Sequence, residues 1–133
     1  MTNEGYIELC RQVFANWSSG DPESNEPLFH PDAVLHDIVA GTHVGWEAMR
    51  AFFARGLGHW PDLTFEMHEF WTSDTGVACS WTMTATVPDD RFGAEAAGKT
   101  WSAPGMSYLT IEAGKVRREA DHWNSGSIAS SLR

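Results

Sequence analysis

The chain has 133 residues, of which 42% are hydrophobic and 20% are charged, so it holds enough apolar side chains for a sizeable core and is not typical of a disordered chain. The length suits one domain, which we expect to span residues 1–133. The formal net charge of −9 argues against nucleic acid and anionic membranes as partners, because both repel an acidic surface.

The first element in chain order is an amphipathic helix. Asn3 is its candidate N-cap and Gly20 its candidate C-terminal stop. Asp21-Pro22 then predicts the start of a short second helix that runs to about Phe29. The apolar face of the first helix recurs at the three-and-four spacing of one helical side, at Tyr6, Leu9, Cys10, Val13, Phe14 and Trp17.

A turn at residues 30–32 separates the second helix from a predicted strand at residues 33–39, and residues 41–45 read as a loop. The loop leads into a third helix, which we expect Gly56 and Gly58 to end. The apolar residues of this third helix are Trp46, Met49, Phe52, Phe53 and Leu57.

The second half of the chain changes to the period-two alternation of strands. Pro104-Gly105 interrupts one of these strands and suggests a β-bulge. A polar tail begins at Asn124. Because the helices are segregated from the strands, the order predicts an α+β fold with a concave, mostly apolar space between sheet and helices. The four predicted strands cover residues 63–68, 77–87, 99–112 and 115–123.

Two acid–imidazole pairs, His36-Asp37 and Asp121-His122, lie inside stretches that otherwise read as buried strands. A carboxylate taken out of water costs several kcal/mol unless it is paired or protonated. Two acids in such places therefore indicate a site that moves protons. The alternative is that strand alternation turns each aspartate toward solvent beside a buried neighbour. The same alternation points each histidine to the face opposite its neighbouring aspartate.

The aromatic content is unusual, with seven Trp and seven Phe against only two Tyr. Some of these residues must fill a core, a subunit interface or an apolar pocket. A wall of strand tryptophans and methionines suits a flat, apolar or aromatic ligand. Trp17 also lies on the apolar stripe of the first helix, which is typical of a core residue. The candidate substrate-binding residues are Trp81, Trp101, Trp123, Met83, Met106, Val13 and Trp17.

The remaining signals point away from metals, cofactors and secretion. Cys10 and Cys79 lie in apolar patterns outside any CxxC pair and read as core thiols in a reducing compartment. No His or Cys spacing matches a metal site, and no Gly-rich loop opens a nucleotide-binding helix. Because no metal or nucleotide motif is present, we expect no cofactor. No secretion signal or membrane span is apparent, so we expect a cytoplasmic protein.

Four segments in order, at residues 20–33, 43–52, 60–65 and 114–124, resemble the nuclear transport factor 2-like superfamily. That superfamily includes ketosteroid isomerases, SnoaL-like polyketide cyclases, limonene-epoxide hydrolases and scytalone dehydratases. The resemblance covers nearly the whole chain. It implies that three N-terminal helices pack in the concave face of a curved, mainly antiparallel sheet, as a cone-shaped α+β barrel.

The resemblance also implies roles for individual residues. Asp37 falls where ketosteroid isomerases carry their proton-abstracting aspartate, but their oxyanion-hole tyrosine and protonated aspartic acid would fall near Val13 and Ser107, which are of other types. Asp121 falls where SnoaL-like cyclases and limonene-epoxide hydrolases carry a catalytic aspartate. The Arg-x-Asp pair of the hydrolases is missing from residues 80–84. The cyclase branch therefore conflicts least with the sequence.

The leading hypothesis is a cofactor-independent enzyme of the cyclase, isomerase or dehydratase type that acts on an apolar carbonyl-bearing or polycyclic molecule. Asp121 would be its general acid/base, assisted by Asp37 or His36. The alternative is a ligand-binding or assembly module without chemistry, which the missing oxyanion donors favour. The surplus of apolar side chains further predicts a homodimer through the outer face of the sheet.

Overall fold

The computed structural model describes residues 1–18 and 21–133 and contains one six-stranded curved sheet with helices packed on it. The helical elements are α1 (Asn3–Trp17), the 3-10 helix η1 (Pro22–Leu28), α2 (Trp46–His59), the short 3-10 helix η2 (Ala94–Ala96) and α3 (Gly126–Ser130). The strands are β1 (Phe29–Asp37), β2 (Gly41–Val44), β3 (Thr64–Thr72), β4 (Gly76–Thr86), β5 (Thr100–Glu112) and β6 (Lys115–Trp123).

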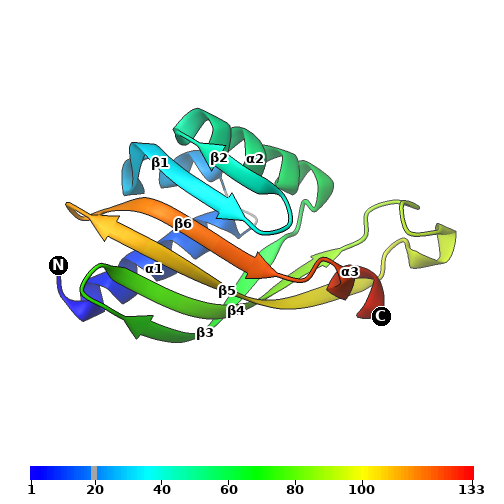
Figure 1. The fold of residues 1–133 in the computed structure, drawn as a ribbon. Helices are drawn as coiled ribbons and strands as arrows, with labels where there is room; N and C mark the ends of the chain where they lie inside the picture. Colours follow the sequence, from blue (N-terminus) through cyan, green and yellow to red (C-terminus); the bar gives the residue numbers. More distant parts are fainter. Residues whose placement is uncertain (19–20) are drawn as a thin grey trace.

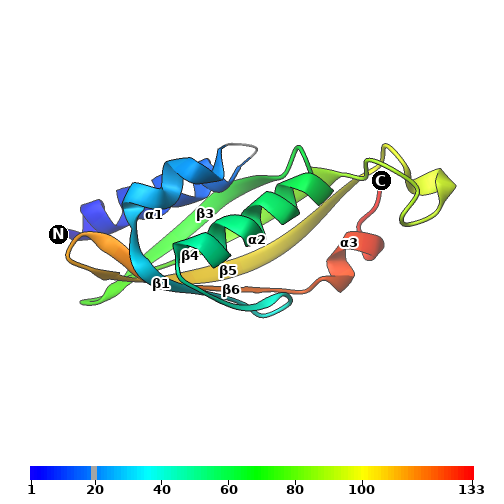
Figure 2. The ribbon, with the colours of Figure 1, turned by 90° about the horizontal axis from the view of Figure 1, so that it is seen from above.

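The strands follow the order β2-β1-β6-β5-β4-β3, and α1 and α2 lie on the same face of the sheet (Figures 1 and 2). All neighbouring strands are antiparallel except β1 and β6, which are parallel. The predicted α+β fold, with helices on a curved and mainly antiparallel sheet, is confirmed. The sheet does not close on itself as a barrel, because β2 and β3 are its two edges.

The helices follow the predicted order with changes at their ends. The hydroxyl of Thr2, not the side chain of Asn3, caps α1 by accepting a hydrogen bond from the backbone N–H of Gly5 at 3.0 Å. The predicted stop at Gly20 lies outside the described residues. The prediction that Gly56 and Gly58 end the third helix was wrong, since α2 continues to His59. A glycine inside a helix costs only about 1 kcal/mol, which packing against the sheet outweighs.

Four predicted features differ from the structure, three of them in strands. The expected turn at residues 30–32 belongs to β1, and the expected loop at residues 41–45 contains β2, because the two segments pair as a hairpin. The tail beyond Asn124 forms the short helix α3. No bulge occurs at Pro104-Gly105, where the pairing of β4 with β5 runs without a shift. The shift lies in the β5–β6 pairing, between Thr110 and Ile111.

Gly105 is explained by close packing instead of a bulge. A Cβ atom at this position would lie 2.3–2.8 Å from three carbons of the buried Trp81 ring. Real Cβ atoms do not approach that closely, so the ring occupies the space that a side chain at this position would need. The missing side chain on β5 thus lets the indole of Trp81 lie flat against the neighbouring strand.

The core fills the space between the sheet and the two long helices. Cys10 and Cys79 are free, buried thiols within it, as predicted. Within residues 1–18 and 21–133, no helix is long and apolar enough to cross a membrane. The largest fully buried side chains include the aromatic residues Trp17, Trp81, Trp101, Phe14 and Phe29.

The Trp81 contact gives a test of the packing. Gly105→Ala should destabilise the protein by about 1–3 kcal/mol, because the new methyl group overpacks the indole. Gly58→Ala is the matched control, since a Cβ there meets nothing within 4 Å and alanine favours a helix by up to about 1 kcal/mol. Urea denaturation of both variants measures the difference. Equal stabilities would contradict the close packing.

Candidate functional site

A mainly aromatic cavity of about 170 Å³ lies between the sheet and α2. Its lining includes four of the predicted wall residues, namely Trp81, Met83, Trp101 and Trp123. The full lining is Asp37, Ala40, Phe52, Phe53, Gly56, Trp60, Leu63, Phe65, Trp81, Met83, Trp101, Asp121 and Trp123.

Asp37 and Asp121 lie side by side in this cavity. They are direct register partners in the parallel pair β1 and β6, so both side chains leave the sheet on the same face. Each residue is only 7% exposed. Among the residues that line the cavity, these two alone carry a carboxyl group, and the others are mainly apolar. Two segments that are far apart in the sequence thus bring both predicted acids into one site.

Asp37 is held in place by three N–H donors. Its Oδ1 accepts hydrogen bonds from the backbone N–H groups of Val39 at 2.8 Å and Ala40 at 3.0 Å. The indole Nε1 of Trp123 donates to both carboxylate oxygens at 3.2 Å. The carboxylate therefore closes the turn between β1 and β2 while its remaining face lines the cavity.

Asp121 has a different environment, because its side-chain donor is a hydroxyl group that itself receives a hydrogen bond. The Ser107 hydroxyl donates to Oδ1 of Asp121 at 2.6 Å, and the indole Nε1 of Trp81 donates to the Ser107 oxygen at 2.9 Å. Burial raises the pKa of Asp121 from its ordinary 3.8 to about 6, and the negative charge of Asp37 acts in the same direction. A carboxyl group with such a pKa can both accept and return a proton near neutral pH.

A third acid, Glu119, lies beneath the cavity and was not predicted from the sequence. Its side chain is fully buried, and the indole Nε1 of Trp17 donates to its Oε1 at 3.3 Å. Burial, together with the neighbouring Asp121, raises the pKa of Glu119 well above its ordinary value. The sequence feature that could have identified Glu119 is its two-residue spacing to Asp121, which places both side chains on the same face of β6.

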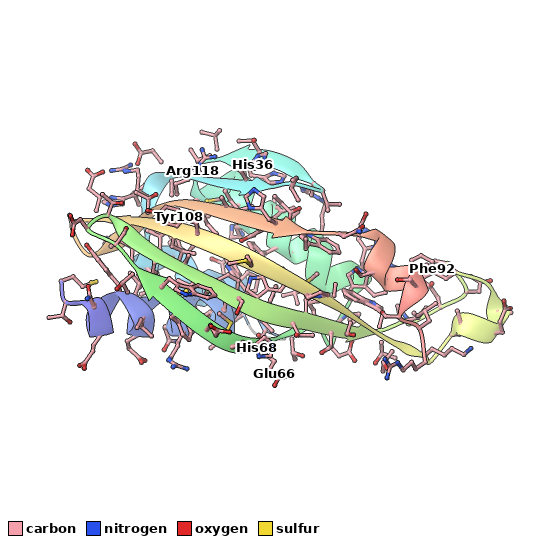
Figure 3. The ribbon with its side chains drawn as sticks, turned by 60° about the horizontal axis from the view of Figure 1, so that its bottom comes forward. His36, Glu66, His68, Phe92, Tyr108 and Arg118 are labelled. Carbon is pink, nitrogen blue, oxygen red and sulfur yellow. The ribbon has the colours of Figure 1, made fainter. Side chains whose placement is uncertain are left out.

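The structure places four predicted site residues away from the cavity. His36 lies on the outer face of the sheet, where its Nδ1 is 2.9 Å from the Thr42 hydroxyl (Figure 3). Met106 is 47% exposed, because it points to the outer face of the sheet like its register partner His122. Strand alternation is the physical reason in both cases. The other two, from the first helix, are Val13 and Trp17.

Val13 and Trp17 are completely buried in the core beside the cavity. The Trp17 ring stacks on Phe53 with ring centroids 3.3 Å apart and an interplanar angle of 5°. Because Phe53 lines the cavity, Trp17 supports the wall from behind instead of forming its surface. The helical stripe thus identifies core residues, and neither residue is placed to touch a ligand in this cavity.

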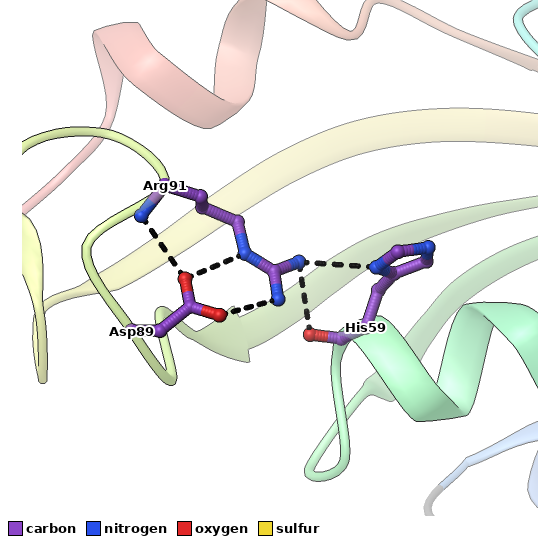
Figure 4. A network of polar contacts seen from close by, with 3 residues as sticks. All are labelled: His59, Asp89 and Arg91. Atoms are coloured by element: carbon purple, nitrogen blue, oxygen red, sulfur yellow. Dashed lines mark hydrogen bonds and ion pairs between the residues drawn. The ribbon is translucent and has the colours of Figure 1, made fainter.

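Trp60, which lines the cavity, contacts the loop that follows β4. The Phe92 ring stacks on Trp60 at 6.1 Å, and the Arg91 guanidinium lies 5.1 Å from the centre of the Trp60 ring. Arg91 is fixed by Asp89 through two side-chain hydrogen bonds of 2.8 and 2.9 Å, and it reaches His59 at 3.3 Å (Figure 4). Hydrogen bonding from Arg91 lowers the pKa of Asp89 to about 2.

No group of three or more His, Cys, Asp or Glu side chains is arranged to hold a metal ion in the part of the chain that the structure describes. The buried acids also have no buried cationic partner among residues 1–18 and 21–133, where the buried charged side chains are Asp37, Glu119 and Asp121. Arg117, which is close in sequence, instead pairs with Asp32 and Glu112 on the surface.

Comparison with known proteins identifies the family. The family model for the SnoaL-like domain matches residues 10–119, which is most of the chain. The chain belongs to the SnoaL-like domain family. This result agrees with the resemblance seen in the four sequence segments. No curated protein matches the SnoaL-like chain by sequence.

Solved structures show the same fold at low sequence identity. IdmH from Streptomyces antibioticus, a proposed polyketide cyclase, has a TM-score of 0.83 and 17% identity, with 93% of this chain and 95% of that chain covered. AclR from Streptomyces galilaeus, a proposed hydroxylase, has a TM-score of 0.78 and 25% identity, with 95% and 93% covered. A ketosteroid isomerase-like protein from Catenulispora acidiphila, in complex with trimethylamine, has a TM-score of 0.82 and 15% identity, with 93% and 91% covered.

The raised pKa of Asp121 predicts a pH dependence of stability. Because the folded state binds this proton more tightly than the unfolded chain, the contribution is complete below about pH 4 and is lost as the pH rises through about 6. Asp121→Asn carries no titrating group there. Its stability relative to the wild type should therefore increase by about 1–2 kcal/mol between pH 5 and pH 8.

Urea denaturation at the two pH values measures this difference. Asp90→Asn, a substitution of an exposed loop aspartate, is the control and should show no such change. A difference between Asp121→Asn and the wild type that stays constant from pH 5 to pH 8 would show that burial does not raise the pKa of Asp121.

Proposed function

We propose that this SnoaL-like protein is an enzyme that transfers a proton at a carbon atom of a small, apolar, carbonyl-bearing substrate, with Asp121 as the general acid/base. The observation that carries the proposal is a buried carboxyl group with a pKa of about 6 in an aromatic cavity. The reaction would be a cyclisation, an isomerisation or a dehydration. The side chains of the site would carry it out without a cofactor.

The proton transfer has a simple balance. The ionised Asp121 takes a proton from the carbon next to the substrate carbonyl, and the electron pair of the broken C–H bond remains on the substrate as an enolate. After the substrate rearranges, the protonated Asp121 returns the proton to carbon or oxygen. Asp37 would fix the geometry next to Asp121 through its three N–H donors, and its negative charge favours the protonated form of Asp121.

The size of the cavity limits the part of the substrate that it can enclose. A cavity of about 150 Å³ holds a benzene molecule, so about 170 Å³ suits one aromatic ring with a small substituent. The reacting ring of a polycyclic substrate would sit beside Asp121, and its remaining rings would extend past Trp60 and Phe92. The aromatic rings of Trp60 and Phe92 suit such a flat extension.

A ligand-binding module without chemistry is the second candidate. It is favoured by the apolar residue Val13 and the small Ser107 at the places where the resemblance to ketosteroid isomerases would require two oxyanion donors. The Ser107 hydroxyl is already used, since it donates to Asp121. The two candidates differ in one measurable property, which is proton exchange at carbon in the bound ligand.

We also propose that the protein forms a homodimer in the cytoplasm. Register pairs place Trp71, Ala78, Tyr108 and Ala120 in one row across the outer face of the sheet, with the exposed Met106 beside it (Figure 3 labels Tyr108). Small alanines between exposed aromatic rings let a second sheet approach closely. The buried free thiols in the core support the reducing compartment.

The row has charges of opposite sign at its two ends. Arg118 and the histidines His36 and His122 lie toward β1 and β6, whereas Glu66 and Glu69 lie on β3 (Figure 3). The two sheets would stack face to face about a two-fold axis that lies between them and parallel to the strands. This places each basic end opposite the acidic end of the other copy. Such self-complementarity is what a symmetric interface requires.

Deuterium exchange tests the enzyme hypothesis. The protein should catalyse exchange at the carbon next to the carbonyl of 1-tetralone, a bicyclic aromatic ketone, in deuterated buffer followed by NMR. Asp121→Asn should slow this exchange by at least about 100-fold, because it removes the general base. His36→Asn, on the outer face, is the control and should leave the rate unchanged.

Saturable quenching of tryptophan fluorescence by 1-tetralone without any catalysed exchange would favour the binding module. Equal losses in Asp121→Asn and His36→Asn would contradict the assignment of the site to the cavity.

Light scattering tests the dimer. The wild type should have about twice the 14.8 kDa mass of one chain at micromolar concentration. Met106→Glu should shift the protein to monomer, because it places a charge within the apolar interface. Ala54→Glu on the exposed side of α2 is the control and should remain dimeric. A monomeric wild type would show that the outer face is not an interface between copies.

A further inference from the structure

We propose that Glu119 is a positioning residue of this site, which carries a proton and donates it in a hydrogen bond to the Asp121 carboxylate. The inference deepens the proposed function, on which it rests for the role of Asp121 as the base. It concerns a residue that lies below the cavity and outside its lining.

The geometry leaves one atom of Glu119 without a partner. The side chain is completely buried, and its Oε1 accepts the hydrogen bond from Trp17. Its Oε2 is buried and has no hydrogen-bond donor among the described residues. A carboxylate oxygen without a donor in an apolar core is strongly unfavourable, so Oε2 is the natural place for a proton.

The acceptor that we assign to this proton is Asp121. Glu119 and Asp121 are both buried and lie two residues apart on β6, so their side chains leave the strand on the same face. Two carboxyl groups can share a hydrogen bond only if one of them is protonated. Asp121 already accepts from the Ser107 hydroxyl and lines the cavity, so it is the acceptor of the pair.

The surroundings favour a neutral Glu119. The titratable groups that face the pair are Asp37 from β1 and Cys79 from β4, with Cys10 of α1 next to Cys79. None of these groups carries a positive charge in any state. Burial without a cation favours the uncharged form of an acid, and the neighbouring Asp121 charge favours it further.

The protonated Glu119 connects the base to the helix layer. The indole of Trp17 on α1 orients Glu119, and Glu119 would orient Asp121 from below. From the side of β5, Ser107 orients Asp121 and is itself oriented by Trp81. Asp121 is then fixed from two directions, while its remaining lone pairs face the cavity. A general base held in this way keeps its alignment toward the substrate proton.

Two substitutions of similar size separate a neutral from a charged Glu119. Glu119→Gln keeps a donor toward Asp121 and an acceptor toward Trp17, so the pKa of Asp121 should stay within about half a unit of the wild type. Glu119→Met removes the donor, and the pKa of Asp121 should rise by about one unit. Carbon-detected NMR of the side-chain carboxyl groups measures both titrations and reports the protonation of Glu119 in the wild type directly.

The outcomes distinguish the alternatives. A decrease of one unit or more in the pKa of Asp121 in Glu119→Gln would show that Glu119 is charged in the wild type and would overturn the proposal. An unchanged pKa in Glu119→Met would also overturn it, because no hydrogen bond would then exist. If Glu119→Met does not fold, the wild-type Glu119 signal decides, since ionisation below pH 7 contradicts the proposal.

The titrations need no substrate, so they are independent of the proposed activity. If the enzyme hypothesis is correct as well, the pH at which 1-tetralone exchange is half-maximal should rise by about one unit in Glu119→Met and should not move in Glu119→Gln. A purely structural role of Glu119 would lower the rate without moving that midpoint. Correct titrations without catalysed exchange would refute the function and leave the Glu119–Asp121 bond in place.

Discussion

The cost of removing carboxyl groups from water is the constraint on which this site depends. Asp37 and Asp121 line one aromatic cavity, and Glu119 is buried outside its lining. No buried cation balances these three acids among the described residues. Asp37 is compensated by N–H donors and Asp121 by the Ser107 hydroxyl. Glu119 has one indole donor, and we propose a proton for its other oxygen. Because their hydrogen-bond donors differ, the three carboxyl groups can have different roles. Asp37 closes a turn, and in our proposals Asp121 is the base and Glu119 positions it.

The parallel pairing of β1 with β6 makes this arrangement possible. It sets Asp37 directly beside Asp121 and leaves the two charges on one face, close enough to affect each other. The same pleat sends His36 and His122 to the outer face, where their ring centroids are 6.5 Å apart. A single register therefore separates an inner, water-poor set of acids from an outer set of imidazoles.

Local patterns predicted the order of helices and strands and part of the cavity lining, because helical and strand periodicities are short-range properties. One omission, Glu119, and one error, Met106, concern the phase of a strand. The shift in the β5–β6 pairing makes Arg117 an extra residue, so counting by twos from the buried Val116 would turn Glu119 outward. Conversely, the pairing at Pro104-Gly105 is unbroken, so Met106 remains on the outer face. Contacts between strands distant in sequence, such as Asp37 with Asp121, cannot be obtained from periodicity, and only the register of β1 with β6 places these two residues side by side.

The cavity wall at Trp60 and the acids are built on separate parts of the chain. The acids belong to β1 and β6, whereas Trp60 contacts the loop with Asp89, Arg91 and Phe92, whose mutual contacts involve no sheet pairing. Mutations in that loop can thus accumulate without disturbing the strand register. Selection can then change which molecules enter while the proton-handling groups are inherited intact. This modularity suits a fold whose structural relatives share its shape at 15–25% identity and carry different proposed activities.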